Sequence, residues 1–102
     1  MNGKYILEGK TPKLVEDVLE WARWYETADR HVAETVLPNS VRVSTVFLGL
    51  DHSFSDGEPI LFETMIFGGE HDEYQERYST WEEAEAGHKR ALAKVEGNHA
   101  RE

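Results

Sequence analysis

The chain has 102 residues, a length that suits one domain with a single hydrophobic core. Its 11 Lys and Arg and 20 Asp and Glu give a formal net charge of −9, which argues against direct binding to nucleic acid or to an acidic membrane, because both need a basic surface. It has no Cys, no signal-peptide core and no apolar run near the ~18 residues of a membrane span, so we expect a cytoplasmic protein without disulfides.

The first third of the chain predicts a short strand followed by a helix. Residues 4–8 form the expected strand, which Gly9 ends. A Thr before Pro12 is typical of a helix start, because the first helical position needs no backbone N–H. Apolar residues then recur at close to 3.6-residue spacing, which predicts a helix over residues 12–28. Its water-facing side should carry the acidic residues Glu16, Asp17 and Glu20.

Residues 30–36 leave two structures open. The segment could extend the preceding helix, or it could form a strand that turns at Pro38 and Asn39. We favour the strand because the segment is rich in β-branched residues. These residues are Val32, Thr35 and Val36.

The central segments, residues 41–50 and 60–67, are apolar on both faces. A strand at the surface of a two-layer domain would alternate polar and apolar residues, so both segments should be covered on both sides. We predict that they form an antiparallel hairpin closed by the loop 51–59. With Leu50 near Pro59, the numbers of opposed residues sum to about 109.

The C-terminal third predicts a short strand and a helix. Residues 74–78 form the strand, and Thr80 with Glu83 has the capping-box pattern of a helix over residues 80–96. Residues 97–102 should fray. The order β-α-β-β-β-β-α indicates a single α+β domain, residues 1–96, in which an antiparallel sheet of four to five strands carries both helices on one face.

The predicted pairing sorts the hairpin residues onto two faces. One face is almost wholly apolar and should lie beneath the helices: Val41, Val43, Thr45, Phe47, Ile60, Phe62, Thr64 and Ile66. The other face carries more large apolar side chains than a soluble monomer usually exposes, so we predict a homodimer that buries them. Its interface residues are Val46, Leu48, Leu61, Met65 and Phe67. Glu63 lies within this patch and needs a partner, for which Arg42 is the nearest opposite charge by parity.

No pattern in the chain fixes a catalytic chemistry. The five His residues have acidic neighbours but no metal-ligand spacing such as H-E-x-x-H, so we predict neither a metal site nor a cofactor. Ser, His and Asp occur together in residues 52–57, but catalytic triads assemble from separated segments, so loop structure explains them better. His88, on the apolar stripe of the last helix, fits a hydrogen-bonded core histidine.

A resemblance rests on three segments: residues 43–52 (VSTVFLGLDH), 61–65 (LFETM) and 77–84 (RYSTWEEA). Through them the chain, from Trp21 to His88, resembles a group of small proteins encoded by tailed phages and by prophages in bacterial genomes. No activity is established for that group, so no functional residue follows from it. The resemblance implies a context, because small acidic phage proteins often inhibit host systems, as anti-CRISPR proteins do, or sequester nucleotide signals.

Two classes of function compete. The first is a non-catalytic inhibitor in the host cytoplasm that binds a basic surface of a nucleic-acid-handling machine. Its contact residues would be Asp51, His52, Phe54, Asp56, Glu70, Asp72 and Glu73. The second is a binder of a small ligand such as a nucleotide, or a small enzyme, with a pocket near Arg30, His31, His52 and Glu63. We favour the first because no catalytic constellation emerges, and we leave Phe54 open between a contact residue and a plug of the core.

Overall fold

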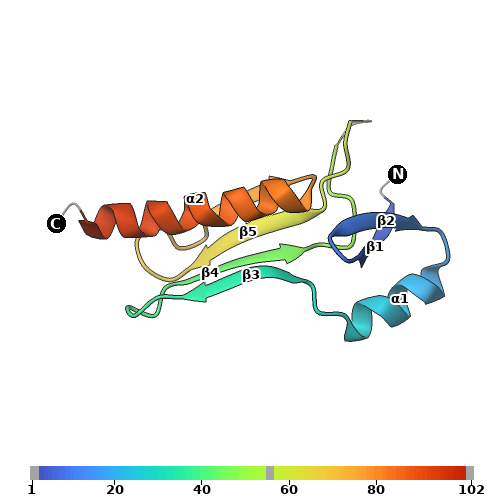
Figure 1. Cartoon of the computed structure of the whole chain (residues 1–102), viewed down its shortest axis with the longest axis horizontal. Coiled ribbons are helices and arrows are strands. Elements are labelled where there is room, and N and C mark those ends of the chain that lie inside the picture. The colour runs from blue at the N-terminus through green and yellow to red at the C-terminus, as the bar shows by residue number, and fades with distance from the viewer. Residues whose placement is uncertain (1–2, 55–56, 101–102) are drawn as a thin grey trace.

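The computed structural model of the protein describes residues 3–54 and 57–100 (Figure 1). Its elements in chain order are β1 (Lys4–Glu8), β2 (Thr11–Val15), α1 (Val18–Thr27), β3 (His31–Val36), β4 (Arg42–Phe47), β5 (Phe62–Phe67), β6 (Gln75–Tyr78) and α2 (Trp81–Ala100). The strands form two antiparallel sheets, the hairpin β1-β2 and a four-stranded sheet of order β3-β4-β5-β6. The predicted α+β class is confirmed, and the observed order has an additional strand before the first helix.

The two helices occupy different places, which corrects the prediction that both cover one face of a single sheet. α2 lies along one face of the four-stranded sheet and contacts all of its strands. α1 packs against β1 and β2 at one end of the molecule (Figure 1). The protein is therefore elongated, 51 × 29 × 20 Å. We call α2 with β3–β6 the sheet body, and β1, β2 and α1 the hairpin body.

Residues 11–15 form β2. We had predicted that the first helix begins in this segment. Gly9, with φ +64°, begins a two-residue turn that places Thr11 opposite Glu8. Pro12 is compatible with this strand because a two-stranded sheet leaves one side of each strand without a ladder. The Thr-Pro pair therefore begins a strand here.

The helix start lies at Asp17, which is the N-cap of α1. Its carboxylate accepts hydrogen bonds from the N–H groups of Leu19 and Glu20, at 2.9 and 3.3 Å. None of the α1 residues is fully buried, and Leu19 is 65% exposed. α1 is thus a helix that rests on the hairpin without enclosing a core of its own.

The central pair of strands in the four-stranded sheet has the predicted register. Residues 31–36 form β3, so the strand interpretation of this segment is confirmed. β4 and β5 pair with Arg42 opposite Phe67, so that the numbers of opposed residues sum to 109. The face beneath α2 is the core, with fully buried side chains at Val43, Thr45, Phe47, Phe62, Thr64 and Ile66.

α2 begins at the predicted capping box. The N–H of Glu83 donates to Thr80 Oγ1, and the Glu83 carboxylate accepts the N–H groups of Ser79 and Thr80, each at 3.1 Å. The helix continues to Ala100, whereas we had expected it to end at residue 96. Residues 101–102, also predicted to fray, lie outside the described residues.

Gly87 allows α2 to pack closely on β6. A Cβ at this position would overlap the ring and hydroxyl of Tyr78. That hydroxyl donates to Glu76 Oε1 at 2.8 Å, and burial raises the pKa of Tyr78, which keeps the hydroxyl protonated as a donor. The contact therefore depends on the absence of a side chain at residue 87.

A small polar cluster lies inside the core, centred on His88. One ring nitrogen is 2.8 Å from Thr45 Oγ1 and the other is 3.0 Å from Thr35 Oγ1, while Thr45 and Thr64 share a hydrogen bond of 2.5 Å. His88 is 5% exposed, and this burial lowers its pKa. The prediction of a hydrogen-bonded core histidine is confirmed.

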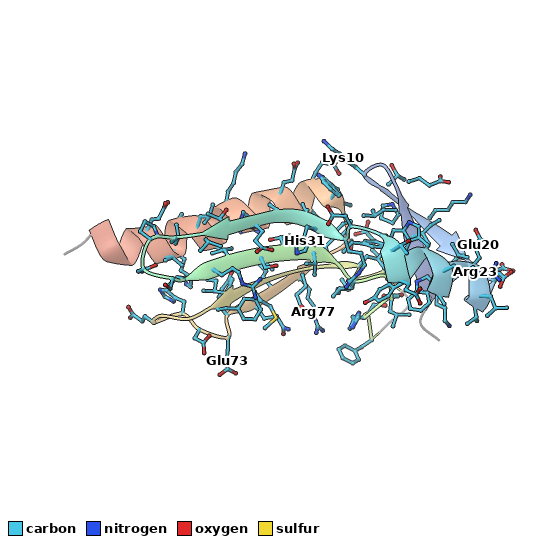
Figure 2. The ribbon with its side chains drawn as sticks, turned by 90° about the horizontal axis from the view of Figure 1, so that it is seen from below. Lys10, Glu20, Arg23, His31, Glu73 and Arg77 are labelled. Carbon is cyan, nitrogen blue, oxygen red and sulfur yellow. The ribbon has the colours of Figure 1, made fainter. Side chains whose placement is uncertain are left out.

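The open face of the sheet is more polar than its two central strands suggested. The flanking strands β3 and β6 add charged groups, so that Glu63 bonds to Arg77 at 2.9 Å and to Gln75 at 2.6 Å instead of to Arg42. Arg42 lies over the Phe67 ring at 4.3 Å and reaches Glu34 at 3.8 Å. Figure 2 shows this face with Arg77 and His31 over the sheet.

The predicted dimer interface changes accordingly. Leu61 is 1% exposed and belongs to the core cluster with Phe47 and Phe62, so it cannot contribute to an interface. Of the residues predicted with it, Phe67 is exposed and the remaining ones are half-buried: Val46, Leu48 and Met65. The excess of apolar surface that suggested a dimer is therefore much smaller, and the oligomeric state stays a prediction.

The two bodies meet at Gly49. Its carbonyl accepts hydrogen bonds from the Tyr5 N–H at 2.8 Å and from Trp21 Nε1 at 3.1 Å. Gly49 has φ +81°, and a Cβ here would lie 3.0 Å from the Tyr25 ring. Trp24 completes the junction by packing its ring edge-on against Phe47.

Candidate functional site

The predicted partner-binding residues fall at opposite ends of the sheet body. Asp51 to Phe54 belong to the loop before β5, and Glu70 to Glu73 to the turn after it. In Figure 2, Glu73 lies beneath the left half of the sheet, and Glu20 and Arg23 lie at the right-hand end of the molecule. The predicted partner-binding residues therefore belong to two segments that β5 separates.

Asp51 organises its own loop. It accepts hydrogen bonds from the N–H groups of Ser53 and Ile60, at 2.8 and 2.9 Å. Burial alone would raise the pKa of Asp51, but these hydrogen bonds outweigh it and hold the pKa below its ordinary value. His52 Nδ1 lies 2.8 Å from the Leu50 carbonyl oxygen, so the ring bonds to backbone here and not to Asp51. Loop structure, as predicted, accounts for these two residues.

Phe54 is 101% exposed, which decides the question that the sequence left open. The ring does not plug the core; it projects from the loop into solvent. A fully exposed aromatic ring offers apolar area that a ligand or partner can cover, so the role of Phe54 as a contact residue stays a prediction. Asp56, predicted to act beside it, lies outside the described residues.

The turn after β5 is acidic and well ordered by its backbone. The Gly68 N–H donates to Asp72 Oδ1 at 2.7 Å, and the Glu73 N–H donates to the Ile66 carbonyl at 2.9 Å. Glu73 has φ +73°, and Gly69 packs against Val41 of the neighbouring turn. The exposed residues of the acidic turn are Glu70, Asp72 and Glu73.

An apolar pocket lies at the same end of the molecule, where the last turns of α2 meet the β3–β4 turn. It has a volume of about 220 Å³, and its walls are Leu37, Pro38, Asn39, Val95 and Glu96. Leu37 and Val95 pack on the same core cluster as Tyr74, which follows the acidic turn. We call the acidic turn with this pocket the acidic end. No local pattern indicates the pocket, because its walls come from segments far apart in the chain.

The residues predicted for a small-ligand pocket bond to different parts of the structure. Arg30 donates to the Phe47 carbonyl at 2.9 Å and lies over the Tyr25 ring. His31 lies between Asp29 and Glu34, and Glu63 bonds to β6. His52 lines a groove, but the other walls of that groove are Ser53, Phe54, Gly57, Glu58, Ile60, Arg77 and Ser79.

That groove continues along the edge strand β6. A second pocket adjoins it and shares Ile60, Arg77 and Ser79, and its far wall is α2 with Glu83, Ala86 and Arg90. The volumes of the two parts are about 380 and 540 Å³. We call the combined feature the β6 groove. Sequence reasoning missed it because Arg77 and Arg90 belong to different elements and neither stands in a motif.

Among residues 3–54 and 57–100, no group of three or more His, Asp or Glu side chains could hold a metal ion. Within the same residues, neither helix is long and apolar enough to cross a membrane. A scan against models of protein families, a search of curated proteins and a search of solved structures each found no match to the chain.

Proposed function

We propose that the protein is a non-catalytic inhibitor whose acidic end binds a basic surface on a host nucleic-acid-handling machine. The observation that carries this proposal is the position of the acidic turn beside an apolar pocket at one end of the molecule. The resemblance to phage-encoded proteins supplies the host context.

The acidic turn and the apolar pocket would contribute to binding in different ways. The carboxylates of the turn attract a surface rich in Lys and Arg, which raises the association rate and selects basic partners. The pocket walls Leu37, Pro38 and Val95 can receive one apolar side chain of the partner, and such anchored side chains supply much of the affinity at protein interfaces.

The basic surfaces of a cell are largely those that hold nucleic acid, because phosphate binding requires clustered Lys and Arg. A small chain of net charge −9 that covers such a surface competes with the nucleic acid directly. Inhibition then needs no catalytic residue, and this suits a protein in which the Asp51 carboxylate and the His52 ring bond to the backbone of their own loop.

Charge reversal at the acidic turn tests the proposal. Glu70→Lys with Glu73→Lys leaves Asp72, which bonds to the turn backbone, in place. The control is Glu20→Lys with Glu26→Lys, which makes the same change of charge on exposed positions of α1 at the other end of the molecule.

The wild-type protein is immobilised, a host partner is captured at low salt, and that partner is then titrated with labelled DNA in the presence of each variant. We expect the wild type and the α1 variant to displace the DNA and the acidic-turn variant to lose ~10-fold or more in affinity. Equal competition by both variants, or a captured partner that keeps its DNA, would contradict the proposal.

A further inference from the structure

Two arginines line the β6 groove in a protein whose net charge is −9. Arg77 stands where its two parts meet, and Arg90 lines the part next to α2. The volumes of the parts fall in the range of ~300–1,000 Å³ that small-molecule sites occupy. The groove is separate from the acidic end. It includes Ile60, which precedes β5, whereas the acidic turn follows the end of β5.

Each arginine is held in place by a carboxylate that is itself held by a second donor. Arg77 Nε donates to Glu63 Oε2 at 2.9 Å, and Glu63 also accepts from Gln75. Arg90 Nη2 donates to Glu76 Oε1 at 2.9 Å, and this carboxylate also accepts the Tyr78 hydroxyl. These bonds use one nitrogen of each guanidinium, whereas a guanidinium offers N–H donors on three nitrogens. An anion in the groove would thus meet two guanidinium groups that are already oriented.

Two carboxylates also line the groove. The Glu83 carboxylate accepts the N–H groups of Ser79 and Thr80, which hold it at the start of α2. Glu58 is exposed at the wall formed by the loop before β5. Both carboxylates would repel an anion bound between the arginines, so neutralising the exposed Glu58 is a sensitive probe of that anion.

Phe54 adds an apolar plane to one wall of the groove. Its ring is fully exposed, and His52 and Ser53 lie beside it in the same part of the groove. A flat aromatic ring of a ligand can stack on Phe54, as nucleic-acid bases stack on aromatic side chains. The groove therefore has a stacking surface and two arginines that can donate hydrogen bonds to an anion, in two adjoining parts.

We infer that the β6 groove binds a small anion that carries an aromatic ring, of the class of a nucleoside phosphate. The phosphate lies against Arg77 and Arg90, and the ring stacks on Phe54. This site is independent of the proposed docking at the acidic end. It also moves the ligand pocket of the sequence analysis from Arg30, His31 and Glu63 to the edge strand β6 and the start of α2, and of the four predicted residues only His52 lines it.

The test is calorimetric titration of the purified protein with adenosine monophosphate, adenosine and inorganic phosphate as separate probes. Arg77→Gln removes one anion donor, and Phe54→Ala removes the stacking plane. The matched control is Arg23→Gln, which makes the same charge change on exposed α1. Arg90→Gln serves if Arg77→Gln fails to fold, since Glu76 then keeps its bond from Tyr78.

We expect the wild type to bind adenosine monophosphate more tightly than either part of it. Arg77→Gln should weaken this binding by ~10-fold, and Phe54→Ala should weaken it without changing the binding of phosphate. Glu58→Gln should strengthen it, and Arg23→Gln and the acidic-turn variant Glu70→Lys with Glu73→Lys should leave it unchanged. No heat of binding at millimolar ligand, or an equal loss in Arg23→Gln and Arg77→Gln, would overturn the inference.

Discussion

The sheet body and the hairpin body bury their residues very differently. The sheet body has a continuous core in which Phe47, Phe62 and Ile66 are 0% exposed. In the hairpin body, Val15 is the one buried apolar residue among those described, and α1 has no buried residue. The difference indicates that the sheet body is the stable unit of the fold and that the hairpin body depends on contacts with it.

The largest expected effect comes from the core of the sheet body. Phe62→Ala removes a ring that packs on Phe47 and Trp81, so it should lower the free energy of unfolding by about 3–5 kcal/mol. Leu19→Ala, on exposed α1, should change it by less than about 0.5 kcal/mol. Urea denaturation measures both, and a similar loss from the two variants would contradict the division into a stable body and a dependent one.

A smaller effect is expected where α2 crosses β6. Gly→Ala within a helix usually stabilises a protein, by up to ~1 kcal/mol. At Gly87 the new Cβ would overlap Tyr78, so Gly87→Ala should instead destabilise by about 1–3 kcal/mol. Gly97→Ala is the matched control in the same helix, because the space around Gly97 is open. Thermal melting of both variants checks the opposite signs, and stabilisation by both would show that α2 does not need close contact with β6.

The third prediction concerns pH and the polar cluster in the core. Burial lowers the pKa of His88 from 6.5, so the unfolded chain binds this proton more readily than the native one. The stability that the neutral ring contributes is therefore complete above pH 6.5 and is lost as the pH falls through the lowered pKa. The lowered pKa values of Asp29, Asp51 and Glu76 place their own titrations below this window.

Urea midpoints measured between pH 7.5 and pH 5 test this dependence. The wild type should lose stability over that range, and His88→Gln should show a much weaker slope. A wild-type curve that is flat between these pH values would contradict a neutral His88 in the core.

The sheet body was predictable because its sequence signals agree with one another. The doubled apolar pattern of residues 41–50 and 60–67, the hairpin register and the capping box at Thr80 all specify the same arrangement. The hairpin body was mispredicted because Thr11, Pro12 and the spacing of Leu14 and Val18 imitate a helix start. The short turn at Gly9 overrides that local signal.

The candidate sites were less predictable than the fold. The exposure of Phe54 depends on whether the core has room for its ring, and sequence alone does not tell this. The acidic residues of the turn after β5 were found from composition, but the pocket beside them joins residues 37–39 to residues 95–96. The β6 groove likewise needs a strand edge and a helix face to be in contact before Arg77 and Arg90 become neighbours.

The junction at Gly49 has a consequence for the order of events during synthesis. The Gly49 carbonyl, which follows β4, accepts the hydrogen bonds from Tyr5 and Trp21, and the next residue, Leu50, forms a β-bridge with Lys4. Residues 3–28 leave the ribosome before any of these partners exists, and β4 itself is held by β5, which is made later still. Residues 3–28 can pair among themselves through β1 and β2, but we expect them to dock on the sheet body only after β4 has paired with β5.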